Sequence, residues 1–336
     1  MLRQVLGQGA EIGCYRSRGL NIVIDDGLHA DNETAPETFY GLKNFATLDE
    51  ALSDGPDVVF VTNPISMHVE TGLAAARAGC NVFFEKPLGD TLAGLDELED
   101  ALAANGLVAL VGYQFRFHPA LAAIRGELEA GSIGRVISAQ LQFGEWLPGM
   151  HPYEDYRESH AARADQGGGV ILCLSHEIDY ACWLFGLPRR VFCVGGHLSN
   201  LAMSGVEDTA HLLLECEVDG RAVPISIYLD FVQRPQRREC LIIGETGHIR
   251  WDHAENVVRV SNSTDGQSKE IAFTGFRRND MFEAQCRNLV AAIEGSAAPV
   301  CSLSDGKATL QVCLAAKQSM TQGQAVSVGA TQHAAA

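Results

Sequence analysis

The chain has 336 residues, 46% of them hydrophobic, and a formal net charge of −17 at pH 7. This length predicts about two domains with buried cores, and the acidic excess argues against nucleic acid or an anionic membrane as a partner, because both bind basic surfaces. The sequence has no run of about 20 apolar residues that could span a membrane, and its first residues lack a signal-peptide pattern.

The ten cysteines are scattered along the chain, and no two of them form a C-x-x-C pair. Several lie in apolar runs, where a free thiol behaves as a small hydrophobic side chain. The pattern favours a reducing cytoplasm and argues against a zinc site, and we expect no metal ligands.

Three glycines near the N-terminus, Gly7, Gly9 and Gly13, have the spacing G-x-G-x-x-x-G, which is one residue longer than the dinucleotide-binding fingerprint. A phosphate-binding loop needs a buried strand before it and a helix after it. Here residues 2–6 have apolar side chains at helical spacing, and residues 10–16 have the pattern of a strand. We therefore expect the end of the first helix and then the second strand, with Met1 an internal methionine and the first strand and glycine loop missing. A degenerate fingerprint is the alternative.

The expected loss concerns the centre of the sheet. In a doubly wound parallel sheet the first strand is central, so its absence would open two sheet edges. It would also remove the loop that binds the pyrophosphate of a dinucleotide. We therefore expect the chain as written to bind such a cofactor poorly or not at all.

Arg16, Ser17 and Arg18 follow the expected second strand. An acid at this strand tip binds the ribose hydroxyls of NAD, whereas arginine suits the 2′-phosphate of NADP. The three residues favour NADP(H), with NAD(H) as the other candidate and a solvated basic turn as the structural alternative. Residues 19–44 predict an irregular insertion to which we assign no chemistry.

From residue 47 onwards the pattern alternates short helices with buried strands, as in α/β domains. His68 lies in the first turns of one helix, where a place on the helix surface is the structural alternative to a role in a site. Tyr113 follows the last of these strands, where a place in the core is the structural alternative. The expected helices are residues 48–52 (capped by Thr47), 66–78, 91–104 and 119–130, and the expected strands are residues 57–62, 82–84 and 107–111.

The segment at residues 80–89 is the most informative part of the chain. Residues 82–84 form an apolar run without polar alternation, which is typical of a strand buried on both faces of a parallel sheet. Such a strand delivers Glu85 and Lys86 to its carboxyl end, where open α/β sheets bind their ligands. Pro87 ends the strand and restricts Lys86 to an extended backbone. On these residues alone, a catalytic lysine and a surface lysine are equally open.

A loop at residues 146–157 is dense in aromatic, histidine and arginine side chains. Aromatic faces and hydrogen-bonding tips are what a polar ring such as a sugar needs. We expect His151, Tyr156 or Arg157 to contact a substrate, with packing of the loop as the alternative.

Three glycines at residues 167–169 allow a close approach of backbone, and a helix follows that Gly186 ends. His176 lies within this expected helix. Hydride transfer from a carbinol needs a base for the hydroxyl proton, and histidine titrates near neutrality.

Four motifs in this order resemble the Gfo/Idh/MocA family of nicotinamide-dependent sugar and polyol oxidoreductases. The motifs are Thr62-Asn63-Pro64, Glu85-Lys86-Pro87, Gly167-Gly168-Gly169 and His176-Glu177-Ile178-Asp179, and the resemblance extends to about residue 320. The loop around residues 155–157 resembles a branch found near nucleotide-sugar and sialic-acid-type sugar pathways. The resemblance implies an α/β fold with a doubly wound parallel, Rossmann-type sheet in a dinucleotide-binding domain (1–117). A substrate and oligomerisation domain (118–329) and a disordered tail (330–336) would follow.

The resemblance also implies two catalytic roles. Lys86 would hydrogen-bond the substrate hydroxyl or carbonyl oxygen and polarise it, and His176 would take or give the proton. Many relatives carry an acid three or four residues before this histidine, but here those positions hold Cys173 and Leu172. Whether Asp179, one turn later, compensates is left open.

The full set of candidate contacts surrounds these two residues. The candidate cofactor contacts are Arg16, Ser17, Arg18, Thr62, Asn63, Pro64, His68, Glu85, Lys86, Pro87 and Tyr113, and the candidate substrate contacts are Lys86, Arg116, His151, Tyr156, Arg157, Cys173 and His176.

Beyond residue 188, alternating apolar residues predict a large open antiparallel sheet. We expect its outer face to carry Leu212, Leu214, Ile225 or Ile227 and to be covered by another subunit in a homodimer or homotetramer. The expected strands are residues 136–144, 191–197, 211–218, 223–231, 239–244, 248–252 and 257–261, and the closing helices are residues 281–293 and 306–320.

Two functions from different classes follow. The first is a cytoplasmic NAD(P)-dependent oxidoreductase that acts on a CH–OH group of a sugar, nucleotide sugar or cyclic polyol through Lys86 and His176. The second is a non-catalytic relative that binds a sugar or a protein partner, which the missing glycine loop and Cys173 would favour.

Overall fold

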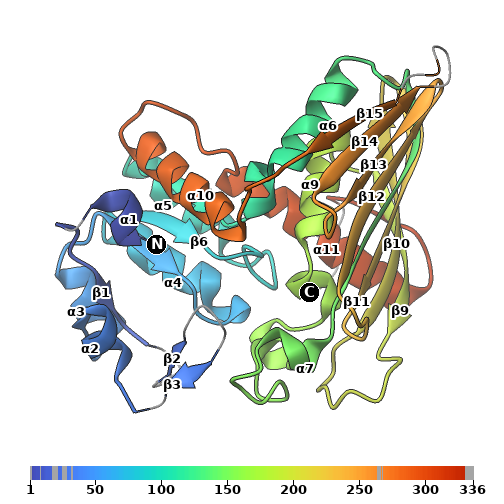
Figure 1. Ribbon diagram of the computed structural model, residues 1–336. Coiled ribbons are helices and arrows are strands. Elements are labelled where there is room, and N and C mark those ends of the chain that lie inside the picture. Colours follow the sequence, from blue (N-terminus) through green and yellow to red (C-terminus); the bar gives the residue numbers. More distant parts are fainter. Residues whose placement is uncertain are drawn as a thin grey trace.

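The computed structural model describes residues 2–7, 9–16, 22–24, 29–31, 33–262, 266 and 268–329, arranged as two halves that face each other (Figure 1). The first half contains helices α1 (Leu2–Leu6), α2 (Pro36–Tyr40), α3 (Leu48–Ser53), α4 (His68–Arg77) and α5 (Leu95–Ala104), and strands β1 (Gly13–Cys14), β2 (Val23–Ile24), β3 (Ala30–Asp31), β4 (Lys43–Asn44), β5 (Val58–Val61), β6 (Asn81–Phe84) and β7 (Ala109–Val111).

The second half begins with helix α6 (Pro119–Glu129). It continues with helices α7 (Leu147–Met150), α8 (Val170–Cys173), α9 (His176–Phe185), α10 (Arg278–Ile293) and α11 (Leu303–Gln322), and strands β8 (Val136–Gly144), β9 (Arg190–Gly196), β10 (Thr209–Val218), β11 (Arg221–Asp230), β12 (Arg237–Gly244), β13 (Gly247–Asp252), β14 (Val257–Asn262), β15 (Ser268–Ala272) and β16 (Val326–Ser327). In the part of the chain that the structure describes, no helix is both long enough and apolar enough to cross a membrane.

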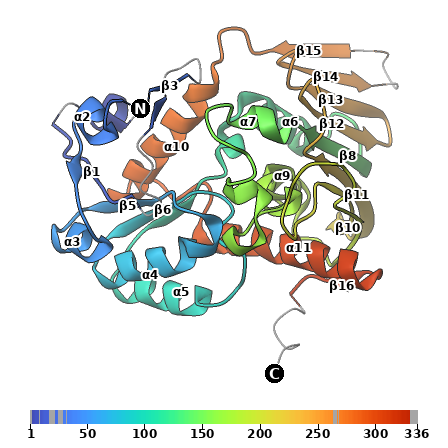
Figure 2. The ribbon, with the colours of Figure 1, turned by 90° about the horizontal axis from the view of Figure 1, so that it is seen from below.

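A three-stranded parallel sheet, β5-β6-β7, is the centre of the first half. Its middle strand β6 is buried on both faces, as the apolar run predicts. On one face α4 comes so close that a Cβ atom on Gly72 would lie 2.2 Å from the Phe84 ring, so only glycine fits there. On the other face Phe83 and Leu110 pack against Leu289 of α10. Figure 2 shows the sheet between α4 and α5 on one side and α10 on the other.

The N-terminal segment confirms part of the expected order. Residues 2–6 form a helix, and β1 lies inside the expected strand, although it is only two residues long. Strand β1 pairs in parallel with β4, and in the described residues this pair is a separate sheet from β5-β6-β7. The prediction of an irregular insertion at residues 19–44 is wrong in part, because α2, β4 and the β2–β3 pair lie there.

A nine-stranded sheet dominates the second half, with the order β15-β14-β13-β12-β8-β11-β10-β9-β16. The strands lie close to the expected ranges, but the prediction of an antiparallel sheet is wrong at one point: β8 and β11 pair in parallel. A long connection through α7, α8 and α9 separates β8 from the later strands. Because such a connection can return the chain in either direction, β8 inserts between β11 and β12 instead of forming a hairpin.

The prediction of the outer face of this sheet is also wrong. Leu212, Leu214, Ile225 and Ile227 are buried on the inner face, where α9 and α11 cover the strands (Figure 1). A shift of one residue exchanges the two faces of a strand. The outer face therefore carries the residues in between, and it exposes Leu213 on β10 and the apolar side chains Phe192 and Val194 on β9.

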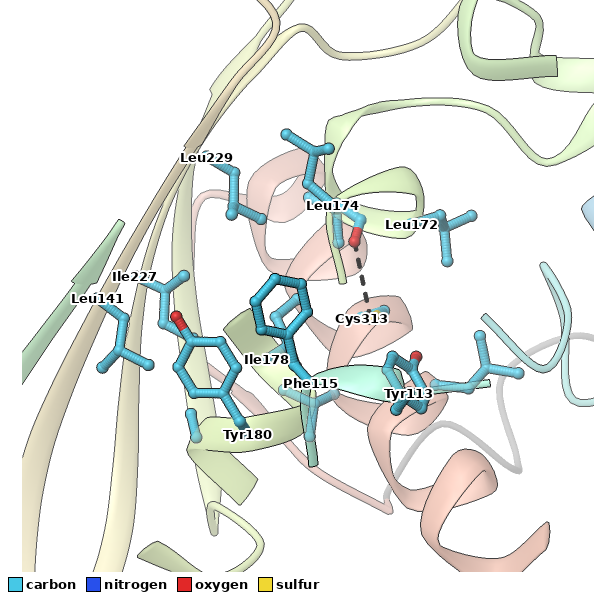
Figure 3. Close-up of a cluster of buried hydrophobic side chains, with 14 of the residues drawn as sticks. Tyr113, Phe115, Leu141, Leu172, Leu174, Ile178, Tyr180, Ile227, Leu229 and Cys313 are labelled. Atoms are coloured by element: carbon cyan, nitrogen blue, oxygen red, sulfur yellow. Dashed lines mark hydrogen bonds between the residues drawn. The ribbon is translucent and has the colours of Figure 1, made fainter. Parts of the chain in front are cut away.

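A continuous apolar core joins the two halves around the start of α9. Figure 3 shows Tyr113 and Phe115, which follow β7, next to Ile178 and Tyr180 of α9 and close to Ile227 of the large sheet. The last part of the chain also returns to the first half, since the Val111 N–H donates to the Cys301 carbonyl at 3.0 Å. The division at residues 117 and 118 stays a prediction, and residues 330–336 lie outside the described residues.

Candidate active site

Lys86 reaches from the first half of the molecule to the second. It follows β6, and its Nζ donates a hydrogen bond to the carbonyl oxygen of Cys173 at the end of α8. The preceding residue supports this direction, because Glu85 accepts the Lys86 N–H at 3.1 Å and donates its own N–H to Val61 at 2.8 Å. The lysine ammonium therefore stands at the carboxyl edge of the parallel sheet, facing the turn that carries His176.

The turn before His176 corrects the expected helix. Instead of one helix, α8 ends at Cys173, and α9 begins at His176. Leu174 leaves the helical conformation with φ −102° and ψ 33°. In a continuous helix the Cys173 carbonyl would accept an N–H from four residues later, whereas here it accepts the Lys86 ammonium. The break thus places the imidazole at the first position of a helix.

The His176 ring is enclosed by aromatic side chains. The residue is 6% exposed, and its ring centroid lies 4.9 Å from that of Phe115 and 5.7 Å from that of Tyr113. Tyr113 is fully buried, and its hydroxyl donates to Ser175 Oγ at 3.2 Å. No described residue forms a hydrogen bond with His176 Nδ1, which is buried. A buried ring nitrogen without a hydrogen-bond partner is a candidate for a hydrogen bond with a ligand.

Burial and nearby cations set the charge of this imidazole. Burial lowers the pKa of His176 well below its ordinary value, and Lys86, Arg238 and Arg278 lower it further. The neutral ring is therefore the form present at neutral pH, and it can accept a proton. Burial raises the pKa of Cys173 to about 12, so this residue stays a thiol.

Asp179 does not support His176 in the described structure. Its two carboxylate oxygens accept hydrogen bonds from Arg116 at 2.8 and 3.1 Å, and one of them also accepts the Thr309 hydroxyl at 3.2 Å. Arg116 donates a further hydrogen bond to the Val300 carbonyl at 3.0 Å. Because all the described contacts of Arg116 lie within the protein, its predicted contact with substrate remains a prediction.

A buried ion pair beside the histidine was missed by the sequence analysis. Glu177 accepts a hydrogen bond from Arg238 Nε at 2.6 Å and one from the Tyr180 hydroxyl at 3.2 Å. The Arg238 guanidinium lies over the rings of Phe115 and Phe143, 4.0 and 3.7 Å from their centroids. Arg238 is directly opposite Phe143 in the β12–β8 pairing, which only the sheet register reveals.

Glu145 is a second residue that the sequence analysis missed. It follows β8 and is half-buried, and no described residue forms a hydrogen bond or an ion pair with its carboxylate. Burial raises the pKa of Glu145, and the nearby cations Arg238 and Lys86 oppose this shift, as does His151. In the sequence, the only sign of a role for Glu145 was its position directly after a strand with alternating apolar and polar residues. Of the three loop candidates, His151 is the one that acts electrostatically on the Glu145 carboxylate. Its Nδ1 lies 3.1 Å from Glu154 Oε1.

The other two loop candidates make contacts within the loop region. The Tyr156 hydroxyl accepts the N–H of Ala202 at 3.0 Å, and Arg157 donates to Asp155 at 2.8 and 2.9 Å. These contacts agree with the alternative of loop packing. Binding of substrate by Tyr156 or Arg157 stays a prediction.

The loop after β5 carries the next group of candidates. Thr62 is exposed, and Pro64 precedes a single 3₁₀ turn, η1 (Ile65–Met67). Asn63 donates from Nδ2 to Thr71 Oγ1 at 2.8 Å, and its Oδ1 is buried without a hydrogen-bond partner among the described residues. Asn63 therefore has an acceptor available for a ligand at the same sheet edge as Lys86.

His68 is inside the molecule, so the alternative of a surface histidine is wrong. It is 1% exposed, and its two ring nitrogens each lie 2.8 Å from a backbone carbonyl oxygen, that of Pro87 for Nδ1 and that of Asn63 for Nε2. It contacts the loops that carry the candidate residues. The sequence could not show this, because both partners are main-chain atoms.

The candidates for the ribose end are only partly described. Arg16 follows β1 and forms an ion pair with Glu37 of α2. Ser17 and Arg18 lie outside the described residues. The described residues also contain no cluster of histidine, cysteine and acidic side chains that could hold a metal ion.

Two family models match the sequence. Residues 20–113 match the GFO/IDH/MocA oxidoreductase family model for the NAD-binding Rossmann fold, and residues 121–250 match the GFO/IDH/MocA C-terminal domain model.

Three similar proteins illustrate the comparison. Myo-inositol 2-dehydrogenase of Thermotoga maritima is 24% identical over 336 residues, which cover 96% of this chain and 97% of that protein. 1,5-Anhydro-D-fructose reductase of Ensifer adhaerens is 32% identical over 201 residues, 59% of each chain. The structure of levoglucosan dehydrogenase in complex with NADH and levoglucosan has the same fold, with a TM-score of 0.77 and 20% identity over 87% of this chain and 86% of that chain.

A Rossmann fold of this type implies a nicotinamide coenzyme, and the described residues fit its nicotinamide end. Two of the buried polar atoms without described hydrogen-bond partners, Asn63 Oδ1 and His176 Nδ1, belong to the segments next to Lys86 and the Cys173 carbonyl. At the pyrophosphate end, Gly7 and Gly9 follow the short helix α1 and precede β1, the reverse of the order in a phosphate-binding loop.

Proposed function

Because the chain belongs to the Gfo/Idh/MocA family of NAD(P)-dependent oxidoreductases, we propose that it oxidises a carbinol, or reduces the corresponding carbonyl, on the ring of a sugar or cyclic polyol. One observation carries the proposal. The Lys86 ammonium is held at the Cys173 carbonyl, at the turn that leads to the neutral, buried His176. The similar proteins act on inositol, anhydrofructose and levoglucosan, to judge by their names, and these are ring compounds with several hydroxyl groups.

In the proposed oxidation, Lys86 binds the substrate oxygen and stabilises the negative charge that develops on it. His176 accepts the hydroxyl proton on a ring nitrogen, which its lowered pKa keeps unprotonated at neutral pH. Asn63 and Lys86 would lie next to a bound nicotinamide, which would supply the hydride acceptor. The aromatic residues Tyr113 and Phe115 exclude water from the histidine and fix the plane of its ring.

The remaining contacts are proposed with the same site. Asn63, Pro64, Glu85 and Pro87 would line the nicotinamide side. NADP(H) is favoured over NAD(H) because Arg16 follows β1, although Glu37 neutralises this arginine in the described structure. A nucleotide sugar remains a narrower candidate within the substrate class.

We further propose that the protein works as a homodimer or homotetramer in the cytoplasm. The exposed apolar side chains on the outer face of β9 and β10 support association through the large sheet. All ten cysteines are free thiols, and eight of them are buried, which suits a reducing compartment.

The test is an assay of coenzyme reduction with myo-inositol, 1,5-anhydro sugars, levoglucosan and UDP-sugars, each with NAD and with NADP. Gly7 and Gly9 follow a helix and precede a strand, so the coenzyme should bind weakly, and we expect slow turnover by the natural chain with a high KM for the coenzyme. In Lys86→Met we expect a further loss of about 100-fold or more, because a positioned polar catalyst contributes at least this much. Lys269→Met, which removes an exposed lysine on β15 far from the site, is the matched control and should retain activity. A folded chain that binds a sugar without turnover with either coenzyme would instead favour the non-catalytic relative.

A further inference from the structure

His68 connects the two loops that carry the proposed nicotinamide contacts. The histidine is the first residue of α4, and it is enclosed between the carboxyl ends of β5 and β6. Its Nε2 lies 2.8 Å from the carbonyl of Asn63, and its Nδ1 lies 2.8 Å from the carbonyl of Pro87. Pro87 is the residue directly after Lys86, so one end of this bridge is adjacent to the proposed catalytic lysine.

The chemistry of both partners is the same. A carbonyl oxygen can only accept a hydrogen bond, so each contact needs a proton on the facing ring nitrogen. A neutral imidazole carries one such proton and would point a lone pair at the second oxygen. The imidazolium ion carries both protons and satisfies both contacts, so the geometry is complete only in the charged form.

Burial and the groups around the His68 ring have opposite effects on its pKa. Burial lowers the pKa of His68, and the two carbonyl contacts raise it. Among charged side chains, Asp90 raises this pKa and Lys86 lowers it. The net direction is downwards, so the ring gains its second proton on the acid side of the ordinary histidine range.

We propose that His68 is a positioning residue that ties the loop after β5 to the loop after β6, and that it holds Lys86 in register when both of its ring nitrogens donate. The inference rests on the proposed function insofar as it concerns Lys86. Among the described residues, the Lys86 N–H donates to the Glu85 carboxylate at 3.1 Å, and the Glu85 N–H donates to Val61 of β5 at 2.8 Å. The contact of His68 with the Pro87 carbonyl supports the other side of Lys86. Displacement of a catalytic group by about 1 Å can lower the rate of a reaction by about 100-fold.

Kinetics test the positioning role. His68→Gln keeps one donor group, the side-chain NH2, which can reach only one of the two carbonyls, and His68→Ala keeps none. We therefore expect kcat to fall in that order, to about 10-fold and 100-fold below the natural chain. In the natural chain, kcat should increase towards acid pH as both ring nitrogens of His68 become protonated. This increase should be absent from both His68 variants. His248→Gln, which changes an exposed histidine on β13, is the matched control for the loss of a histidine. Variants that are merely less stable, with unchanged kcat and pH profile in the folded fraction, would overturn the proposal.

Ring protonation is measured separately, without substrate or coenzyme. In the full chain labelled with ¹⁵N-histidine, the His68 signals are those missing from His68→Gln. We expect two protonated ring nitrogens at the acid end of a titration from pH 9 to 5, with a midpoint equal to that of the kinetic change. A ring nitrogen that stays unprotonated over the whole range would overturn the bridge. If the natural chain has no turnover with any substrate, the proposed function fails, and this measurement still decides whether His68 donates to both loops.

Discussion

Lys86 and Cys173 are 87 positions apart in the chain, and the hydrogen bond between them is one of the contacts that join the two halves. The place of Lys86 at the end of a buried strand could be predicted from the apolar run before it, whereas its catalytic role came only from the family resemblance and stays a prediction. The role of His176 has the same standing, and the break in its helix could not be predicted, since the lysine that uses the Cys173 carbonyl comes from the other half. Arg238 could not be predicted, because its position depends on a pairing between β12 and β8.

The pH dependence of activity tests the charge on His176. Because burial and three cations lower the pKa of this imidazole, its neutral form persists as pH falls, and loss of alcohol oxidation should begin only well below pH 6.5. Arg278→Gln removes one of these cations, so the pKa should rise and the acid limb of the kcat/KM profile should move to higher pH.

Arg287→Gln is the control for that experiment, since it removes an exposed arginine of the same helix, α10, which pairs with Glu283. It should leave the acid limb in place. A limb at the ordinary histidine pH in the natural chain would contradict the buried, cation-surrounded ring.

Arg116 and Asp179 form a buried ion pair, and removing one partner leaves the other charge buried alone. We expect Arg116→Met to lower the free energy of unfolding by about 3–5 kcal/mol, as for other broken buried pairs. Arg116→Met combined with Asp179→Leu should lose less, and urea unfolding of the three chains measures the difference. A raised KM without a loss of stability in Arg116→Met would instead favour the predicted contact with substrate.

At the scale of elements, the alternation of apolar and polar residues predicted the strands of the large sheet closely. It could not assign their faces, because the helix that covers β9, α11, comes more than a hundred residues later. It also missed the parallel pairing of β8, which a long connection permits. Patterns within a strand fix its side-chain period, whereas its partners are fixed by packing.

The turn before α8 positions the carbonyl that Lys86 binds. Gly169 has φ +102°, and a Cβ atom there would lie 2.5 Å from Glu207 Oε1, which accepts the Ile171 N–H at 3.1 Å. Gly169→Ala should therefore cost about 1–3 kcal/mol in unfolding free energy and also lower kcat, because it displaces α8. Thermal unfolding and initial rates measure the two effects.

Gly131→Ala is the matched control. Gly131 also has a positive φ, +68°, but an added Cβ would meet nothing within 4 Å, and the residue lies after α6, away from the site. This variant should lose stability and keep its kcat. Equal losses of kcat in both variants would show that the turn at Gly169 has no special role.

At the scale of the whole molecule, the outer face of the large sheet is the clearest candidate for contact between subunits. Val194 is 59% exposed at this face, beside Phe192 and Leu213. If the proposed oligomer forms through this face, Val194→Glu should dissociate it, because the substitution would place a charge in an apolar contact, and light scattering would report the lower mass. Phe39→Glu, at an equally exposed apolar residue on α2, is the control and should leave the mass unchanged.

The parallel sheet of the first half depends on a helix from the end of the chain. Phe83 and Leu110 on one sheet face are covered by Leu289 of α10, and Val111 is tied to Cys301. During synthesis, the first half therefore leaves the ribosome with one apolar face of its sheet exposed. This face stays exposed until α10, near the end of the polypeptide, has been translated. A nascent chain of this kind is prone to aggregate until its own later segment covers the sheet.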